Sequence, residues 1–240
     1  KIQYQVADGQ NTMGSVTRSY EDVKPVTGTP AGSTANANDG YSFVNWTVNG
    51  VEVSNEQVLT PAVVAAHAKN GENVFVQTTF VANFQRKLVL KAKNDQKTYD
   101  GTALTGADAG YEIIGGQLKA GDRLEVTYSG SQTDVGKTEN SIVKAVVYRG
   151  EEDVTSQYAI APFQDGELEV TPATVTMQSA SATKTYDGTP LTKTDEMVIT
   201  GFADGEGVEC YDFASRTDVG STSNTFKYRA ASNTKLSNYD

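Results

Sequence analysis

Few residues in this sequence are able to do catalytic or metal chemistry. It contains one histidine, His67, and one cysteine, Cys210, among 240 residues. A Cys/His zinc site, a CxxC redox pair and a disulfide framework each need more of them than this. A Ser-His-Asp or Cys-His enzyme would depend on His67 alone. We therefore expect no catalytic residue, no cofactor and no metal site, and we interpret His67 as an exposed or half-packed helix residue.

Cys210 lies in Glu209-Cys210-Tyr211-Asp212-Phe213, which we predict to be a strand. A reactive thiol needs an electropositive neighbourhood, and Glu209 and Asp212 provide the opposite charge. We interpret Cys210 as a small apolar residue of that strand.

Two acidic clusters, Glu151-Glu152-Asp153 and Asp204-Gly205-Glu206, contain the carboxylates that glycoside hydrolysis or calcium binding would need. Neither cluster has the alternating oxygen ligands of a calcium loop. We interpret both as solvated turns, with adventitious calcium as the alternative.

The composition narrows the class of protein further. The formal net charge is −10, and nucleic-acid binding needs a positive surface, so we expect no nucleic-acid partner. No apolar run approaches the roughly 18 to 20 residues that span a bilayer, so we expect no membrane segment. The chain holds 29 Thr and 26 Val but 9 Leu. β-Branched residues favour strands, which predicts a mainly β fold.

An internal repeat organises the second half of the chain. Lys97-Thr98-Tyr99-Asp100-Gly101-Thr102 recurs unchanged at residues 184–189, and Ser131-Gln132-Thr133-Asp134-Val135-Gly136 recurs at 215–220 with one change. In the first copy we predict strands at 88–93, 124–128, 142–148 and 167–171, the third of them buried on both faces. Asp-Gly and Asp-Val-Gly mark turns between them.

The second copy stops before its counterpart of the closing strand. In the first copy 13 residues follow Tyr158 up to Thr171, whereas one residue follows Tyr239. We expect about a dozen further residues and an unpaired sheet edge at this end.

The first 84 residues differ from the repeats. We predict strands at 2–6, 51–53 and 73–80, and we expect the aromatic residues Tyr41, Phe43 and Trp46 to supply much of the core. One helix is predicted, with Thr60 as N-cap, Pro61 at N1, Lys69 in the last turn and Gly71 at C′.

These motifs resemble two known families of repeats. Gly32-Ser33-Thr34-Ala35, Gly40-Tyr41-Ser42-Phe43-Val44-Asn45-Trp46 and Val74-Phe75-Val76 resemble a divergent internalin-type B repeat. The later two units resemble the mostly-beta-grasp repeats of Gram-positive surface proteins, through Lys-x-Tyr-Asp-Gly-Thr, Gly-Asp, Ser-x-Thr-Asp-Val-Gly, Asn-Tyr and Gly-x-Leu-x-Val-Thr. Gln157 replaces the usual Asn in the first copy, and the second copy lacks the closing motif. The resemblance implies β-grasp-like units and supplies no catalytic residue.

We therefore predict a mainly β, β-rich α+β chain of three small β-grasp-like units in tandem: 1–84 as the B-repeat-like unit, 85–172 as the first repeat and 173–240 as the second repeat. One short helix belongs to the first unit. Short linkers near residues 82–84 and 171–173 predict an elongated, semi-rigid molecule.

The predicted function is that of a non-enzymatic structural or adhesive segment of a Gram-positive cell-surface protein, acting as a monomeric spacer or stalk. The resemblance implies an extracellular location, with cell-wall attachment through parts of the parent outside this sequence. The alternative is an adhesin module that binds a host or matrix glycoprotein or glycan. Lys97 and Lys184 also raise the alternative of an isopeptide crosslink, which would lower the intact mass by about 17 Da, the mass of one ammonia. A crosslinking Lys has to be desolvated beside a protonated carboxyl.

Overall fold

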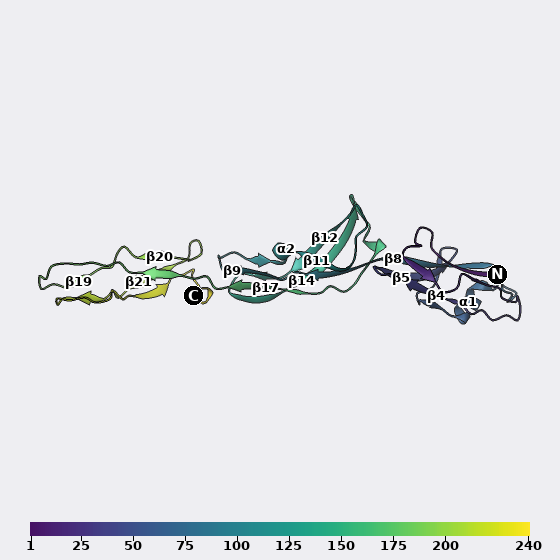
Figure 1. Ribbon diagram of the computed structural model, residues 1–240, viewed down its shortest axis with the longest axis horizontal. Helices are drawn as coiled ribbons and strands as arrows, with labels where there is room; N and C mark the ends of the chain where they lie inside the picture. Colours follow the sequence, from purple (N-terminus) through teal and green to yellow (C-terminus); the bar gives the residue numbers. More distant parts are fainter. The chain divides into compact units, whose positions relative to one another are not determined.

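The chain folds mainly as β structure. The computed structural model, drawn in Figure 1, describes residues 1–240. It contains 23 strands, two α-helices and two 3-10 helices. This confirms the mainly β class expected from the many β-branched residues. The residues group into two compact units. The N-terminal compact unit holds residues 1–91, 111–127 and 142–164, and the C-terminal compact unit holds residues 92–110, 128–141 and 165–240.

The boundary between the compact units divides the segment predicted as the first repeat. Strands β12 (Asp122–Ser129) and β14 (Gly136–Arg149) contribute residues to both units. The division of the sequence into 1–84, 85–172 and 173–240 stays a prediction.

The first 92 residues contain eight strands and one helix. They are β1 (Ile2–Val6), β2 (Gly14–Val16), β3 (Tyr20–Glu21), β4 (Ser33–Ala37), β5 (Tyr41–Val48), β6 (Val51–Ser54), β7 (Val58–Leu59), α1 (Pro61–Ala68) and β8 (Thr78–Ala92). One sheet has the order β3-β1-β8-β5-β6, with β1 parallel and β5 antiparallel to β8, and a second has the order β2-β4-β7. Trp46 is fully buried in the core with Tyr4 and Phe80, Phe43 packs at its edge, and Tyr41 lies outside it.

Strand β8 runs through residues 82–84, where the sequence predicts a linker. The strand begins at Thr78 and continues without a break to Ala92, so it joins the predicted last strand of the first unit to the predicted opening strand of the first repeat. Ala82 and Phe84 are buried in the core. Apolar side chains at alternate positions keep this stretch in the sheet, and the linker prediction is wrong.

Helix α1 begins as the sequence predicts and ends differently. The Thr60 hydroxyl accepts a hydrogen bond from the Val63 N–H, and Pro61 is the first helical residue. The helix ends at Ala68 because Lys69 is extended and pairs with Phe75 across a β-bridge. The Gly71 C′ role is therefore wrong, and the chain leaves the helix directly into a bridged turn.

The structure contains a second α-helix, α2 (Gly106–Ala109), that the sequence does not predict. It has a single turn, too short for an apolar period to be visible. Its start is held by a capping box, in which the Asp108 carboxylate accepts hydrogen bonds from the Thr105 N–H and hydroxyl at 2.8 and 2.6 Å.

The first repeat supplies the remaining strands up to residue 171. Besides β12 and β14 they are β9 (Asp95–Thr98), β10 (Leu104–Thr105), β11 (Tyr111–Gly116), β13 (Ser131–Gln132), β15 (Glu152–Asp153), β16 (Tyr158–Ile160) and β17 (Gly166–Thr171). Strand β14 is not buried on both faces as predicted. Ile142 and Val147 are buried, whereas Val143 is 55% exposed, because one face of this part of the strand meets solvent.

Strand β17 holds the first repeat together within the C-terminal compact unit. It lies between β14, to which it is antiparallel, and β9, to which it is parallel. Its alternate side chains Leu168 and Val170 are fully buried beside Tyr99 and Leu104. The predicted alternation of this strand is confirmed.

The second repeat forms three two-stranded sheets. Its elements are β18 (Thr176–Gln178), β19 (Leu191–Thr192), β20 (Val198–Thr200), β21 (Val208–Tyr211), β22 (Ser215–Arg216) and β23 (Lys227–Ala230). Between residues 174 and 240 the only buried residue is Asn238. This segment therefore lacks the apolar core that β17 completes in the first repeat.

Candidate functional site

The single histidine and the single cysteine lie on separate elements. His67 is exposed on α1, as predicted, and Cys210 is half-buried in β21, within the strand predicted for it. Burial raises the pKa of the Cys210 thiol, which opposes thiolate chemistry. No group of three or more His, Cys, Asp or Glu side chains is arranged to hold a metal ion. None of the helices combines the length and the apolar character that crossing a membrane requires.

The two acidic clusters have different surroundings. Glu152 and Asp153 form the short exposed strand β15, in agreement with a solvated turn. Glu206 is half-buried, and its carboxylate accepts hydrogen bonds from Tyr99 Oη at 2.5 Å and from Tyr239 Oη at 2.8 Å. The solvated-turn interpretation is therefore wrong for Glu206, because the fold brings two distant tyrosines onto its carboxylate.

A tyrosine–carboxylate pair occurs once in each repeat. Tyr158 Oη donates to Asp122 at 2.6 Å and accepts from the Lys119 N–H at 2.9 Å. Tyr239 Oη donates to Glu206 and accepts from the Ala203 N–H at 3.1 Å. Burial is the main cause that raises the pKa of Tyr239, to about 12.

The pairing of these tyrosines with carboxylates was not predicted from the sequence. The signal was present, because Gly121-Asp122 matches Gly205-Glu206 at the offset of 84 that the repeats share. In the first repeat Arg149 also binds the fully buried Asp122 carboxylate through Nε at 2.8 Å and Nη2 at 3.0 Å. These hydrogen bonds lower the pKa of Asp122.

The repeated Lys-Thr-Tyr-Asp-Gly-Thr motif forms the same turn twice. Lys97 Nζ contacts Asp100 Oδ1 at 2.7 Å and Thr102 Oγ1 at 2.7 Å. Lys184 makes the equivalent contacts with Asp187 at 2.8 Å and Thr189 at 2.6 Å. The Lys97 hydrogen bond is the main cause that lowers the pKa of Asp100 to about 2. An aspartate with a lowered pKa, exposed on a turn, favours the interpretation of the motif as a structural turn rather than an isopeptide crosslink.

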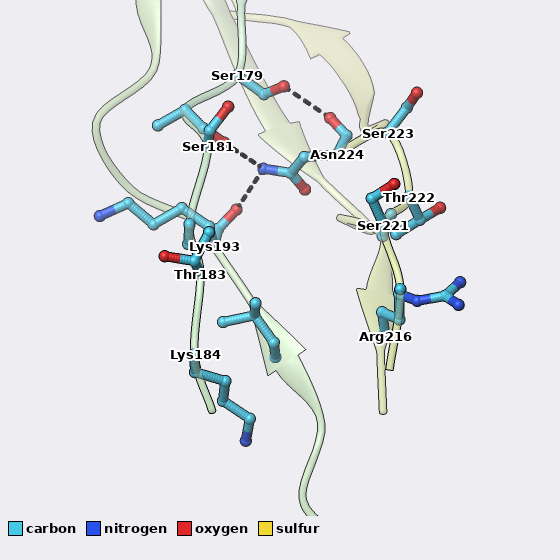
Figure 2. A pocket seen from close by; sticks show the side chains of 15 residues that line it. Ser179, Ser181, Thr183, Lys184, Lys193, Arg216, Ser221, Thr222, Ser223 and Asn224 are labelled. Carbon is cyan, nitrogen blue, oxygen red and sulfur yellow. Dashed lines mark hydrogen bonds between the residues drawn. The ribbon is translucent and has the colours of Figure 1, made fainter. Parts of the chain in front are cut away.

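A groove of about 400 Å³ lies in the second repeat. Residues 179–184 form one wall, and residues 220–224 with Arg216 form the other, as Figure 2 shows. Leu191, Lys193 and Ala214 complete the lining. The walls carry mostly small and hydroxylated side chains, and neither 179–184 nor 220–224 belongs to a strand.

Asn224 holds the two walls of this groove in place. Its Nδ2 donates to the backbone carbonyl oxygens of Ala180 at 3.0 Å and Lys193 at 2.9 Å (Figure 2). The backbone carbonyl oxygen of Asn224 accepts a hydrogen bond from Ser179 Oγ at 2.6 Å. The first repeat contains the counterpart, since Asn140 Nδ2 donates to the Lys93 carbonyl at 2.8 Å. The spacing of the walls is thus set before anything enters the groove.

A second hollow, of about 530 Å³, lies in the N-terminal compact unit. Its lining includes three cationic residues, Arg86, Lys119 and Arg149, together with Gln10 and Gln157. Arg149 is oriented by Asp122 and Gln157, and the Arg86 guanidinium lies 5.5 Å from the centre of the Tyr41 ring. Convergent cations in an acidic chain offer a place for an anionic group.

Comparison with known proteins gives a match for the N-terminal part of the chain. No curated protein and no solved structure matches the chain significantly. Residues 4–87 match the family model described as the divergent InlB B-repeat domain. This confirms the internalin-type B-repeat resemblance of the first unit. The mostly-beta-grasp resemblance of the later two units stays a prediction. The N-terminal third of the chain is therefore similar to a divergent InlB B-repeat domain, which is a surface repeat module.

Proposed function

We propose that this chain is a structural and adhesive segment of a Gram-positive cell-surface protein, serving as a spacer made of tandem β modules. The observation that carries the proposal is the packing of the first repeat's copied turns against the second repeat. A B-repeat-like segment followed by two copies of another module is a typical organisation of a repeat protein, in which each module contacts its neighbour. The match of residues 4–87 supports the surface location.

The first turn in this packing contains Tyr99. Its ring is 8% exposed and lies edge-on to the Tyr239 ring, with 5.3 Å between the ring centres. Its hydroxyl donates to Glu206. The apolar contact extends to Ala173 and Ala203. Buried aromatic contact of this kind resists separation of the two repeats.

The second turn contains Asp134 and Val135. The Asp134 carboxylate accepts from Asn238 Nδ2 at 2.8 Å and from Lys235 Nζ at 2.7 Å. Asn238 is buried, and its Oδ1 accepts from the Val135 N–H at 3.0 Å. These hydrogen bonds orient the two repeats relative to each other at the apolar contact. A module chain joined in this way would transmit load along the polypeptide and keep a distal domain away from the cell wall.

Two experiments test the spacer role. Antibodies raised against residues 1–240 should label intact cells that express the parent protein, and removal of the cell wall should release the label. Small-angle scattering of the purified chain should give the profile of an elongated monomer. A compact scattering profile, or labelling that requires permeabilised cells, would count against the proposal.

The hollow lined by Arg86, Lys119 and Arg149 favours a second function, adhesion to acidic glycans on host or matrix glycoproteins. Cationic side chains bind carboxylate and sulfate groups in a partly enclosed site. A glycan array should show retention of sialylated or sulfated glycans, with the signal reduced in Lys119→Ala. Lys144→Ala, on β14, is the control outside this hollow. Equal signals for both variants would contradict glycan binding at this hollow.

A further inference from the structure

The groove of the second repeat corresponds residue by residue to the site of β17 in the first repeat. In the first repeat, β17 pairs with β14 through Gly136, Lys137, Thr138, Glu139 and Asn140, and with β9 from Asp95 to Thr98. Positions 136–140 are equivalent to 220–224, because the two copies are offset by 84 residues there. Positions 95–97 are equivalent to 182–184, where the offset is 87 residues. All eight of these positions line the groove, whereas Thr185, the counterpart of Thr98, does not.

Two side-chain contacts that border the groove repeat contacts of the first repeat. Arg216 Nε donates to the Asp218 carbonyl at 3.0 Å, as its counterpart Gln132 Nε2 donates to the Asp134 carbonyl at 2.8 Å. Asn224 repeats the role of Asn140 at the other end. The groove is therefore preorganised, and what it lacks is a backbone between its walls.

The first repeat also defines the side chains that fit. Gly166 passes so close to the carbonyls of Ala92 and Lys93 that a Cβ there would lie 2.5 Å from each oxygen. The counterparts of these two residues are Ser179 and Ala180, which stand at the same end of the groove. Two residues and four residues further along β17, Leu168 and Val170 enter the core. A matching occupant has the pattern Gly-x-Leu-x-Val-Thr.

Exposed apolar side chains mark the same place. Tyr186 is 61% exposed and Val219 is 81% exposed. Their counterparts in the first repeat, Tyr99 and Val135, belong to the apolar cluster that contains Leu168 and Val170. A strand in the groove would bring aliphatic side chains toward this apolar surface.

The backbone that precedes this region has the same pairing register in both repeats. In the first repeat Tyr158 pairs in parallel with Arg86, and the chain then reaches Gly166 eight residues later. In the second repeat Tyr239 pairs in parallel with Ala173, which is the position equivalent to Arg86. Asp240 continues this pairing through hydrogen bonds with Ala173 and Val175. The backbone at Asp240 thus has the position and direction that lead to β17 in the first repeat.

We propose that this groove is an acceptor site for an added β-strand of the pattern Gly-x-Leu-x-Val-Thr. The strand lies antiparallel to 220–224 and parallel to 182–184, and its backbone forms ladder hydrogen bonds with both walls. Strand addition uses main-chain hydrogen bonds for affinity and alternate side-chain positions for specificity. Until it is filled, the groove is an open acceptor for a strand of this chemistry.

The test extends the full chain by the twelve residues copied from 160–171, placed after Asp240. Hydrogen exchange followed by mass spectrometry reports on the backbone amides of 181–184 and 220–224. Exchange there should slow by about tenfold or more relative to the unextended chain. The amides of 95–98, which β17 covers in both proteins, provide the internal reference and should not change.

A matched extension, with aspartate at the positions copied from Leu168 and Val170, should leave exchange as fast as in the unextended chain. A synthetic peptide copied from 164–171, added to the unextended chain, should protect the same amides at high peptide concentration. If the extended chain does not fold, this peptide measurement decides. The proposal is overturned if neither the extension nor the peptide protects the walls, or if the aspartate extension protects equally. Protection by the free peptide, with none from a folded extended chain, supports strand addition from a separate polypeptide.

Discussion

At the scale of single residues, identical sequences make identical local contacts and still end in different surroundings. Lys97 and Lys184 bind the aspartate three residues ahead in the same way. Tyr99 is nevertheless buried, whereas Tyr186 is exposed. Hydrogen bonds within six residues follow from the sequence itself, but the burial of a tyrosine depends on what packs over it. For Tyr99 the covering residues include Leu168, Val170 and Tyr239, which lie more than 60 positions away.

The Asp100 turn should lose its contribution to stability in acid. The folded pKa of Asp100 is about 2, below the value of about 3.9 for an unfolded aspartate. Its contribution is therefore fully present above about pH 4 and is lost as the pH falls through 2. A carbon-13 titration of the carboxyl groups should give Asp100 a midpoint near 2, and Asp100→Asn should remove part of the acid destabilisation. A midpoint near 4 would contradict the lysine–aspartate contact.

The tyrosine–carboxylate pair should be important for stability. Tyr158→Phe removes the hydroxyl that donates to the buried Asp122 carboxylate and accepts from the Lys119 N–H. We expect the free energy of unfolding to fall by about 2 kcal/mol, because a hydrogen bond to a charged group is lost. Urea denaturation measures this loss. Tyr228→Phe, at a half-exposed ring, serves as the control, and equal effects of the two substitutions would disprove the assigned role.

At the scale of elements, β8 shows how tertiary contact decides the extent of a strand. Its neighbours β1, β5, β11 and β16 pair with different parts of its length. The partners β1 and β16 are parallel to β8 and come from opposite sides of it in the sequence. Local turn signals at residues 82–84 are weak compared with this ladder of partners. One strand therefore replaces two strands and a linker.

Glycine at position 116 allows β11 to approach β8. Gly116 has φ +75°, and a Cβ there would collide with the carbonyl oxygen of Lys87. Gly116→Ala should destabilise the chain by about 2 to 4 kcal/mol, combining left-handed strain with a forced backbone shift. Gly121→Ala is the matched control, because Gly121 has φ +87° with open space around it. It should cost about 1 kcal/mol. Thermal denaturation compares the two, and equal shifts in Tm would exclude the close approach.

At the scale of the whole molecule, the two repeats differ in what completes them. The first repeat buries Leu168 and Val170, whereas the second leaves an open groove at the equivalent place. Packing of apolar side chains accounts for most of the stability of a small domain. The second repeat should therefore open more readily than the first.

Trypsin provides an internal comparison of the two repeats. Lys97 and Lys184 stand in the same six-residue sequence, and their side chains are similarly exposed. Lys97 is paired with Val170 in the sheet, whereas Lys184 belongs to no strand. Limited digestion followed by mass spectrometry should show cleavage after Lys184 at least about tenfold faster, because a protease needs unpaired backbone. Equal rates would mean that the second repeat is as well closed as the first.

Much of this could be predicted from the sequence where the signals are local. Thr60 and Pro61 marked the helix start, the alternation of 167–171 marked β17, and Asp-Gly marked the repeated turn. One of the features not predicted involves residues far apart in the chain. The role of Glu206 depends on Tyr99, 107 residues earlier. Helix α2 was missed because one turn has too few residues to show a period.

The sequence by itself determined the mainly β class, the presence of two copies of one module and the expectation of an unpaired edge in the second copy. Each of these follows from the type, order and spacing of the residues, without any contact between distant parts of the chain. Only the tertiary structure decided the continuity of β8, the tyrosine–carboxylate pairs and the groove between 182–184 and 220–224. Parallel pairing and side-chain burial join segments that are far apart in the chain. No local pattern specifies which of many such partners will meet.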